Sequence, residues 1–141
     1  MTESVKRVEL IGLPGLPLIE TGDDVFALIS DGLDSSGIGV QQDDVIVVTS
    51  KIISKAQGRW VDLTSIEPDE AALEVAEKCG KDPREVALIL RESVRISRMR
   101  MGVLITEHKL GFTSANAGID HSNARPGEQW RLLLPENPDH D

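Results

Sequence analysis

The chain has few of the residues that build several common kinds of protein. It holds one cysteine in 141 residues, Cys79, which excludes a disulfide within the chain and a zinc site made of cysteines. Its aromatic residues are Phe26, Phe112, Trp60 and Trp130, and tyrosine is absent, so we expect no aromatic platform for nucleic-acid bases. The hydrophobic core must therefore be built from aliphatic side chains and alanine.

Positive charge is also scarce. The formal net charge is −9, from 15 Lys and Arg against 24 Asp and Glu, and such a chain repels polyanions, so we expect no nucleic-acid partner. A phosphate ligand would have to be held locally, by a few lysines or by a divalent cation on a carboxylate. The chain also lacks an apolar run of the roughly 20 residues that a membrane helix needs, and its opening, MTESVKRVEL, lacks a signal pattern. We therefore expect a cytoplasmic protein without a membrane partner.

The length and composition of the chain indicate one domain. The length and the 40% hydrophobic content predict a single domain over residues 1–141. Alternating residues predict a strand over 4–12, and the continuous Val/Ile run in 43–51 predicts a central strand buried on both faces. Further strands are predicted at 59–63, between 96 and 115 with a hairpin turn near 107–111, and at 130–134.

Helix signals lie between these strands. The pattern predicts a helix over 21–33 with Thr21 as its cap, and a short helix or turn over 52–59. Pro68 opens a further helix that Gly80 closes, and Asp82 caps the next one. In that last helix we expect a buried stripe made of Val86, Ile89, Leu90 and Val94. The mixed order predicts an α+β (mixed α/β) fold, a mixed β-sheet with packed helices.

One cluster of polar residues follows the predicted central strand. The segment VVTSKIISKAQGR presents Ser50, Lys51, Ser54, Lys55 and Arg59 where sheet strands commonly offer ligand groups. If the segment is helical, its two lysines share a face. The glycine-rich Walker A order is absent. From the pattern alone, two solvated lysines on an exposed turn are the favoured interpretation.

A second cluster lies in GFTSANAGIDHSNARPGE, residues 111–128. It sets Asn116, Asp120 and Asn123 close together among small residues. An Asp-x-x-Asn arrangement can hold Mg²⁺ or Mn²⁺, which prefer oxygen ligands. The alternative is an Asx turn, in which these side chains satisfy the local backbone. The pattern does not decide between the two.

Two other features give weaker signals. The histidines, His108, His121 and His140, have no metal-pair spacing and no nucleophile beside them, so we expect solvated loop residues. The loop GLPGLPL, residues 12–18, has glycines that let backbone approach a ligand, but its prolines lack the N–H donors of a phosphate cradle. A structural loop is the favoured interpretation.

Taken together, GLPLI…GDD, DVIVVTSKIISKAQGR and ANAGIDHSN resemble, in order and spacing, the coenzyme F-420-0:L-glutamate ligase family of deazaflavin coenzyme maturation. The resemblance runs from about residue 7 to residue 139. It implies the N-terminal part of the gamma-glutamyl ligase fold, so that residues 1–141 would be an incomplete N-terminal portion of a longer ligase domain. It also implies a GTP-dependent ligase that adds L-glutamate to coenzyme F-420-0 by amide formation through an acyl phosphate.

The resemblance further implies the site and its ligands. It implies GTP as co-substrate and Mg²⁺ or Mn²⁺, with K⁺ as a further candidate. The partners expected are small-molecule substrates and, because strand edges favour self-association, a second copy in a homodimer. The alternatives are a non-catalytic nucleotide-binding module and a metal-dependent phosphohydrolase. By motif, the catalytic residues are Lys55 and Asp120, the metal ligand is Asp120, and the nucleotide contacts are Leu16, Pro17, Leu18, Ile19, Ser50, Lys51, Lys55 and Asn123.

Overall fold

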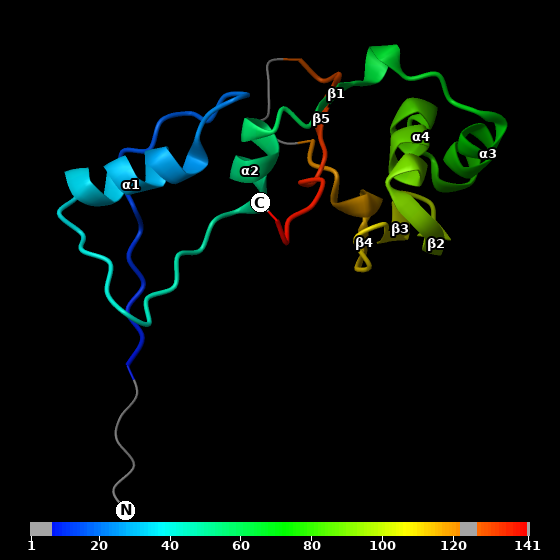
Figure 1. The fold of residues 1–141 in the computed structure, drawn as a ribbon. Helices are drawn as coiled ribbons and strands as arrows, with labels where there is room; N and C mark the ends of the chain where they lie inside the picture. The colour runs from blue at the N-terminus through cyan, green and yellow to red at the C-terminus, as the bar shows by residue number, and fades with distance from the viewer. Residues whose placement is uncertain (1–6, 122–126, 141) are drawn as a thin grey trace, which may run out of the picture.

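A computed structural model describes residues 7–121 and 127–140. Within them helices and antiparallel strands are mixed, which confirms the α+β class (Figure 1). The helices are α1 (Val25–Ser35), α2 (Ser50–Ala56), α3 (Glu70–Cys79) and α4 (Pro83–Arg91), with short 3₁₀ turns η1 (Leu63–Ser65) and η2 (Asn116–Gly118). The strands are β1 (Trp60–Asp62), β2 (Ser93–Arg100), β3 (Val103–His108), β4 (Thr113–Ala115) and β5 (Trp130–Leu132).

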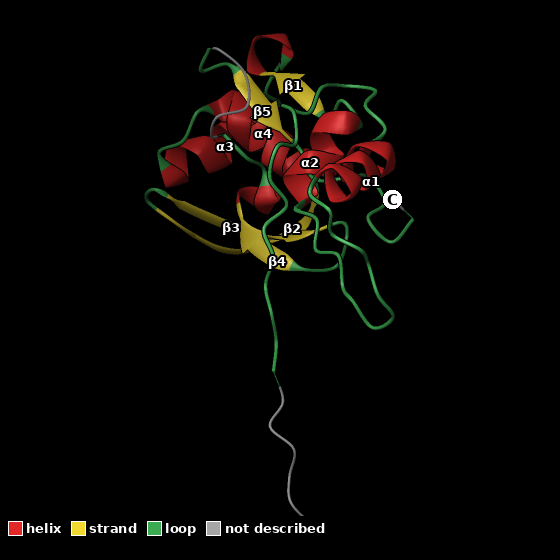
Figure 2. Cartoon of the chain, turned by 90° about the vertical axis from the view of Figure 1, so that its left-hand side faces the viewer, coloured by secondary structure: helices red, strands yellow, loops and turns green. Residues whose placement is uncertain are grey.

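The strands form two small antiparallel sheets. One has the order β2-β3-β4, with a tight turn between β2 and β3, and the other pairs β1 with β5 so that Val61 lies opposite Arg131. Helices α3 and α4 pack on each other and on β2, and both views show the three-stranded sheet below them (Figure 2). The core lies between these elements. It contains Leu63, Ile66, Ala72, Ala76, Cys79, Val86, Ala87, Leu88, Ile89, Leu104, Ala117 and Leu133.

The C-terminal end of α3 and the N-terminal end of α4 lie where the sequence signals predict them. Asp82 caps α4, its carboxylate accepting a hydrogen bond from the Arg84 backbone N–H at 2.9 Å. Gly80 ends α3 in the left-handed conformation at φ +67°, and a Cβ there would overlap the sulfur of Met101. The stripe on α4 is buried at Val86 and Ile89. The prediction for Val94 is wrong, because the helix ends at Arg91 and Val94 faces solvent from β2.

The N-terminal third differs from the sequence expectations. Residues 7–12 and 44–49 belong to no helix and no sheet, and Asp43 lies in a turn, so the predictions of a strand over 4–12 and of a buried central strand are wrong for the described residues. The physical reason is pairing, since an extended segment becomes a strand when a neighbour takes its N–H and C=O groups. Helix α1 begins later than predicted, and its cap is Asp24 rather than Thr21, with Ala27 N–H as donor at 3.0 Å.

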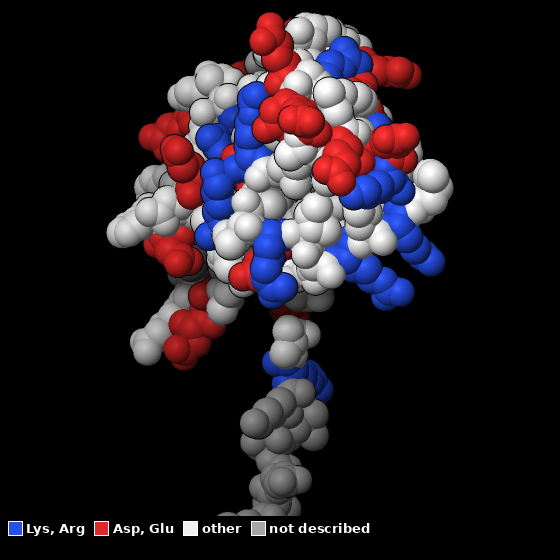
Figure 3. Space-filling view, turned by 90° about the vertical axis from the view of Figure 1, so that its right-hand side faces the viewer, with Lys and Arg blue, Asp and Glu red and all other residues white. Residues whose placement is uncertain are grey.

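Two global properties bear on function. None of the helices in the part of the chain that the structure describes is both long enough and apolar enough to cross a membrane. Figure 3 views the side of the molecule that carries α3 and α4, and it shows acidic and basic side chains interspersed.

Candidate functional site

Helix α2 carries the first polar cluster. Its N-cap residue, Thr49, is extended, and the helix then runs for two turns to Ala56. Lys51 and Lys55 are four residues apart and so lie on one side of this helix, one turn from each other. Ser54 is fully buried on the side that meets β5. The helix therefore presents its lysines from a position that the core fixes.

The second cluster is carried by a turn of unusual backbone conformation. Asn116, Ala117 and Gly118 have φ values of +52°, +54° and +69°, in the left-handed region. Each non-glycine residue held there costs on the order of 1–3 kcal/mol, and such strain often accompanies functional sites. Gly118 has a second constraint, because a Cβ would lie 2.8 Å from Leu134 Cδ1. Glycine is therefore required at position 118, in the turn that leads to Asp120.

Asp120 is positioned by a partner far away in the sequence. Its backbone N–H donates to the Leu132 carbonyl, and its own carbonyl accepts from the Leu132 N–H, both at 2.9 Å. This isolated bridge extends the edge of β5. The Asp120 backbone is therefore fixed to the same strand against which α2 packs.

The structure brings the two clusters together at a single ion pair. Lys51 Nζ lies 2.5 Å from Asp120 Oδ2, and the two side chains are 37% and 27% exposed. They border a small hollow of about 280 Å³ between α2 and the β5 edge. A cation and a carboxylate here share an opening that a small ligand can reach. The hollow is lined by Thr49, Ser50, Lys51, Ser54, Gly118, Asp120, Leu132, Leu133 and Leu134.

The other predicted contacts are placed differently. Lys55 lies in the last turn of α2, where its carbonyl accepts from Thr21 Oγ1 at 3.4 Å. The loop holding Leu16, Pro17, Leu18 and Ile19 is not part of the Lys51–Asp120 hollow. It is joined to the end of α2 through the bond from Gly22 N–H to the Ala56 carbonyl, at 2.8 Å. Asn123 lies outside the described residues.

The ligand set for a metal is small in the described part of the chain. No group of three or more His, Cys, Asp or Glu side chains there is arranged to hold a metal ion. One carboxylate still fits Mg²⁺ or Mn²⁺ bound together with a phosphate ligand, because Mg²⁺ typically takes one or two carboxylates and completes its shell with phosphate oxygens and water. Asp120 is suited to this role by its place on the hollow beside Lys51.

Arg59 links the end of α2 to the strand that supports Asp120. Its Nε donates to the Leu134 carbonyl at 3.1 Å, and its own carbonyl accepts from the Leu133 N–H at 3.0 Å. Its guanidinium also lies 3.5 Å from the Glu92 carboxylate. Arg59 therefore links the end of α2 to the chain after β5.

His108 contradicts the sequence expectation of a solvated loop residue. It is the last residue of β3, is 3% exposed and stacks on Phe112 with ring centroids 4.9 Å apart. Nδ1 accepts from the Leu110 N–H at 3.0 Å, so Nε2 carries the proton and points toward Glu92, 3.8 Å away. Burial of the imidazole lowers the pKa of His108 below its usual range, and Glu92 partly opposes this. His108 is therefore a neutral core residue.

Sequence reasoning missed several residues of the hollow. Thr49 had a usable signal, because a threonine directly before a helical segment is a common cap. Gly118 and the three leucines 132–134 had none, since they reach the hollow through the long-range pairing of Asp120 with Leu132.

Comparison with known proteins places the chain among ligases. The family model for F420-0:Gamma-glutamyl ligase matches residues 15–141. The coenzyme F420:L-glutamate ligase of Methanothermobacter thermautotrophicus is 42% identical over 132 residues, covering 94% of this chain and 52% of that protein. The proteins of the same name from Archaeoglobus fulgidus and Methanopyrus kandleri are 41% and 40% identical, over 94% and 86% of this chain and 50% and 45% of theirs. The chain thus spans about half the length of these relatives.

Proposed function

Because the chain belongs to the F420-0:gamma-glutamyl ligase family, we propose that it supplies the nucleotide- and metal-binding half of a ligase that joins L-glutamate to coenzyme F-420-0. The observation that carries the proposal is the ion pair between Lys51 and Asp120 on the hollow beside α2. A lysine ammonium, a type of group that binds phosphate, and a carboxylate, a type of group that binds Mg²⁺, lie in contact there. The assignment of GTP, of a divalent cation and of the acyl-phosphate route belongs to this proposal.

The proposed reaction has two steps whose atoms balance. A terminal carboxylate oxygen of F-420-0 attacks the γ-phosphorus of GTP, so that a bond from carboxylate oxygen to phosphorus forms and the bond to GDP breaks. The amine of L-glutamate then attacks the acyl carbon, which forms the amide and releases inorganic phosphate. The amine loses a proton in this step. One GTP is consumed for each amide.

The first step brings anions together, and this defines what the residues must do. Two unit anions 4 Å apart repel by about 4 kcal/mol at an effective dielectric near 20, so a carboxylate meets a triphosphate only if cations neutralise it. Lys51 and Lys55 supply compact positive charges from one side of α2, and the Ser50 hydroxyl begins the same helix. In this proposal the two lysines and Ser50 bind the phosphates, and the loop with Leu16–Ile19 borders the rest of the nucleotide.

The existing ion pair suits this exchange of partners. A partly exposed pair contributes about 0–1 kcal/mol, so separating Lys51 from Asp120 costs little. When a metal–nucleotide complex enters, phosphate oxygens replace the carboxylate beside Lys51. Asp120 would hold the Mg²⁺ or Mn²⁺, which supplies charge neutralisation at the terminal phosphates.

The test is a product assay. The chain is expressed together with the part of the Methanothermobacter relative that it does not match, and the complex receives GTP, Mn²⁺, F-420-0 and L-glutamate. We expect glutamylated coenzyme by mass spectrometry, one GDP per amide, and a loss of at least about 100-fold in Lys51→Ala and Asp120→Asn, the size of effect expected when charge stabilisation is removed. Lys78→Ala on α3 is the matched control and keeps full activity, because Lys78 pairs with Glu74 on the surface.

Two alternatives correspond to other outcomes. The single carboxylate that lines the hollow also fits a non-catalytic nucleotide-binding module, which would bind GTP and form no amide. A metal-dependent phosphohydrolase would release GDP at the same rate without F-420-0. Either result rules out the ligase assignment.

A further inference from the structure

The N-terminal third contains two extended apolar segments without partners. No backbone hydrogen bond joins residues 8–11 or 45–48 to another residue that the structure describes. Their side chains are exposed, with Leu10 at 92% and Val47 at 86%. Extended backbone with free N–H and C=O groups is a template for pairing with a further strand. Both segments therefore have backbone N–H and C=O groups that are free to pair with an added β-strand.

The second segment is held in place at both ends. Before it, Asp44 closes a turn by accepting from the Gln41 N–H at 2.8 Å, and Asp43 has a φ of +74°. After it, Thr49 begins α2, which the core fixes. Ile46 is less exposed than Val45 and Val47, as expected for alternating faces of a strand. The backbone is thus already arranged for pairing.

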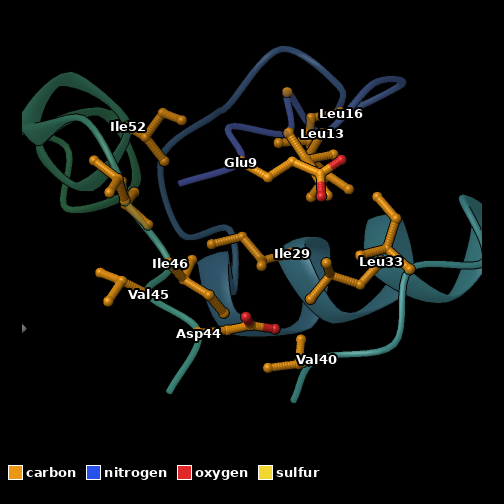
Figure 4. Close-up of a pocket in the computed structure, with 15 residues that line it drawn as sticks. Glu9, Leu13, Leu16, Ile29, Leu33, Val40, Asp44, Val45, Ile46 and Ile52 are labelled. Carbon is orange, nitrogen blue, oxygen red and sulfur yellow. The ribbon is translucent and has the colours of Figure 1, made fainter. Parts of the chain in front are cut away.

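Between the two segments and α1 lies an apolar hollow of about 370 Å³. Figure 4 shows Ile29 and Leu33 of α1 on one side and Ile46 on another, while Glu9 and Asp44 also border the space. Helix α1 has no buried residue, although its apolar side faces this hollow. Apolar side chains from α1 and from both segments therefore border one hollow, and α1 buries none of its own among the described residues.

We propose that this face, formed by residues 8–11, residues 44–48 and the apolar side of α1, binds β-strand segments supplied by the half of the ligase relatives that this chain does not match. Those relatives are about twice as long, so they contain a region with no counterpart here. Added strands would pair with both open edges and fill the hollow.

Charge argues for this occupant over a second copy of the same face. Face-to-face pairing of two copies would bring two sets of Glu9 and Asp44 together around one apolar space, and like charges in such a setting repel. A different polypeptide can place neutral or basic residues there. The inference rests on family membership and on the geometry of the face, and it does not require that the Lys51–Asp120 hollow perform catalysis.

The test measures assembly rather than activity. The chain, carrying an affinity tag, is produced together with the unmatched part of the Methanothermobacter relative, and the purified material is analysed by light scattering and hydrogen exchange. We expect a one-to-one complex in which the amides of residues 45–48 exchange at least about tenfold more slowly than in the chain alone. Val47→Asp should abolish the complex, whereas Leu73→Asp, on an exposed position of α3, should retain it. Because both side chains are exposed, neither variant is expected to unfold the chain.

A second measurement does not depend on producing the unmatched part of the relative as a separate polypeptide. In the full-length Methanothermobacter relative, the amides aligned with residues 45–48 should be protected, and the protection should not change on dilution. The proposal is overturned if those amides exchange freely in the relative, if Val47→Asp and wild type assemble alike, or if this chain alone forms a homodimer that protects residues 45–48. Assembly without product would retain this inference and reject the proposed ligase function.

Discussion

Residues 7–48 and residues 50–134 contain similar aliphatic side chains, but these side chains differ strongly in how far they are buried. In the second region Val86 and Ile89 are fully buried against a sheet, whereas in the first Val45 and Val47 are more than four-fifths exposed. The difference is in pairing, since β2, β3 and β4 follow one another along the chain and find each other as neighbours. The extended segments of the first region have no such neighbour in the described structure.

This comparison shows what stabilises the candidate site. The Lys51–Asp120 pair lies at the border of the two regions, but both of its supports, α2 on β5 and the bridge to Leu132, belong to the packed one. The loop with Leu16–Ile19 belongs to the first region, residues 7–48, which is loosely packed. Figure 1 shows this region on the other side of α2 from the three-stranded sheet. The Lys51–Asp120 part of the proposed site is therefore supported by the packed region alone.

The largest expected effect tests the comparison itself. Ile89→Ala removes a fully buried side chain from α4 and should lower the free energy of unfolding by about 2–5 kcal/mol. Phe26→Ala on α1 removes a larger side chain that is 81% exposed, and should change it by less than about 0.5 kcal/mol. Urea titrations of the two variants measure both values. Equal losses would show that α1 is packed in solution and would break the comparison.

A second prediction sharpens the role of the left-handed turn before Asp120. Gly118→Ala introduces a Cβ 2.8 Å from Leu134 Cδ1 at a φ of +69°, whereas Gly102→Ala, at +75°, meets nothing within 4 Å. Both variants incur about 1–2 kcal/mol for a left-handed alanine. We expect Gly118→Ala to lose at least about 1 kcal/mol more in urea titration, because an overpacked side chain must move. Equal losses of stability in the two variants would mean that the Leu134 side chain moves aside without cost.

The third prediction concerns pH. Burial lowers the pKa of His108, so below its ordinary value near 6.5 the unfolded chain binds a proton that the folded chain does not. The stability contributed by the neutral imidazole is complete above pH 6.5 and is lost as the pH falls toward the lowered pKa, with a slope of at most about 1.4 kcal/mol per pH unit. Urea titrations between pH 7 and 5 should show this slope in wild type and in His140→Gln, and its loss in His108→Gln. An unchanged slope in His108→Gln would contradict the assignment.

The sequence predicted the packed region well, because its signals are local. Asp82 before Pro83 and Gly80 after an apolar stripe mark helix ends whatever else the chain does. The alternation in VLITEH also held the information that His108 is buried, since it shares a face with Leu104 and Thr106. Applying period two to that histidine would have corrected the prediction.

The predictions that were wrong concern segments whose structure depends on pairing with a distant part of the chain. Residues 4–12 and 43–51 have the composition of strands, but composition cannot state whether a pairing strand is at hand. The same holds for the hollow, whose leucines arrive through the pairing of Asp120 with Leu132. The approach of Lys51 to Asp120 was suggested by family resemblance, because 69 positions separate them and no local pattern connects them. The roles assigned to all of the site residues stay predictions, namely those of Asp120, Ser50, Lys51, Lys55, Leu16–Ile19 and Asn123.

Calorimetric titration of the chain with GTP, with and without Mn²⁺, tests most directly whether the Lys51–Asp120 pair is a nucleotide and metal site. With Mn²⁺, we predict saturable binding that weakens at least about tenfold, or 1.4 kcal/mol, in Lys51→Ala and in Asp120→Asn, and is unchanged in Lys78→Ala. Without Mn²⁺, Asp120→Asn should bind GTP no more weakly than wild type, because the carboxylate then repels the phosphates. Binding that ignores both substitutions, or no binding at all, would contradict the account.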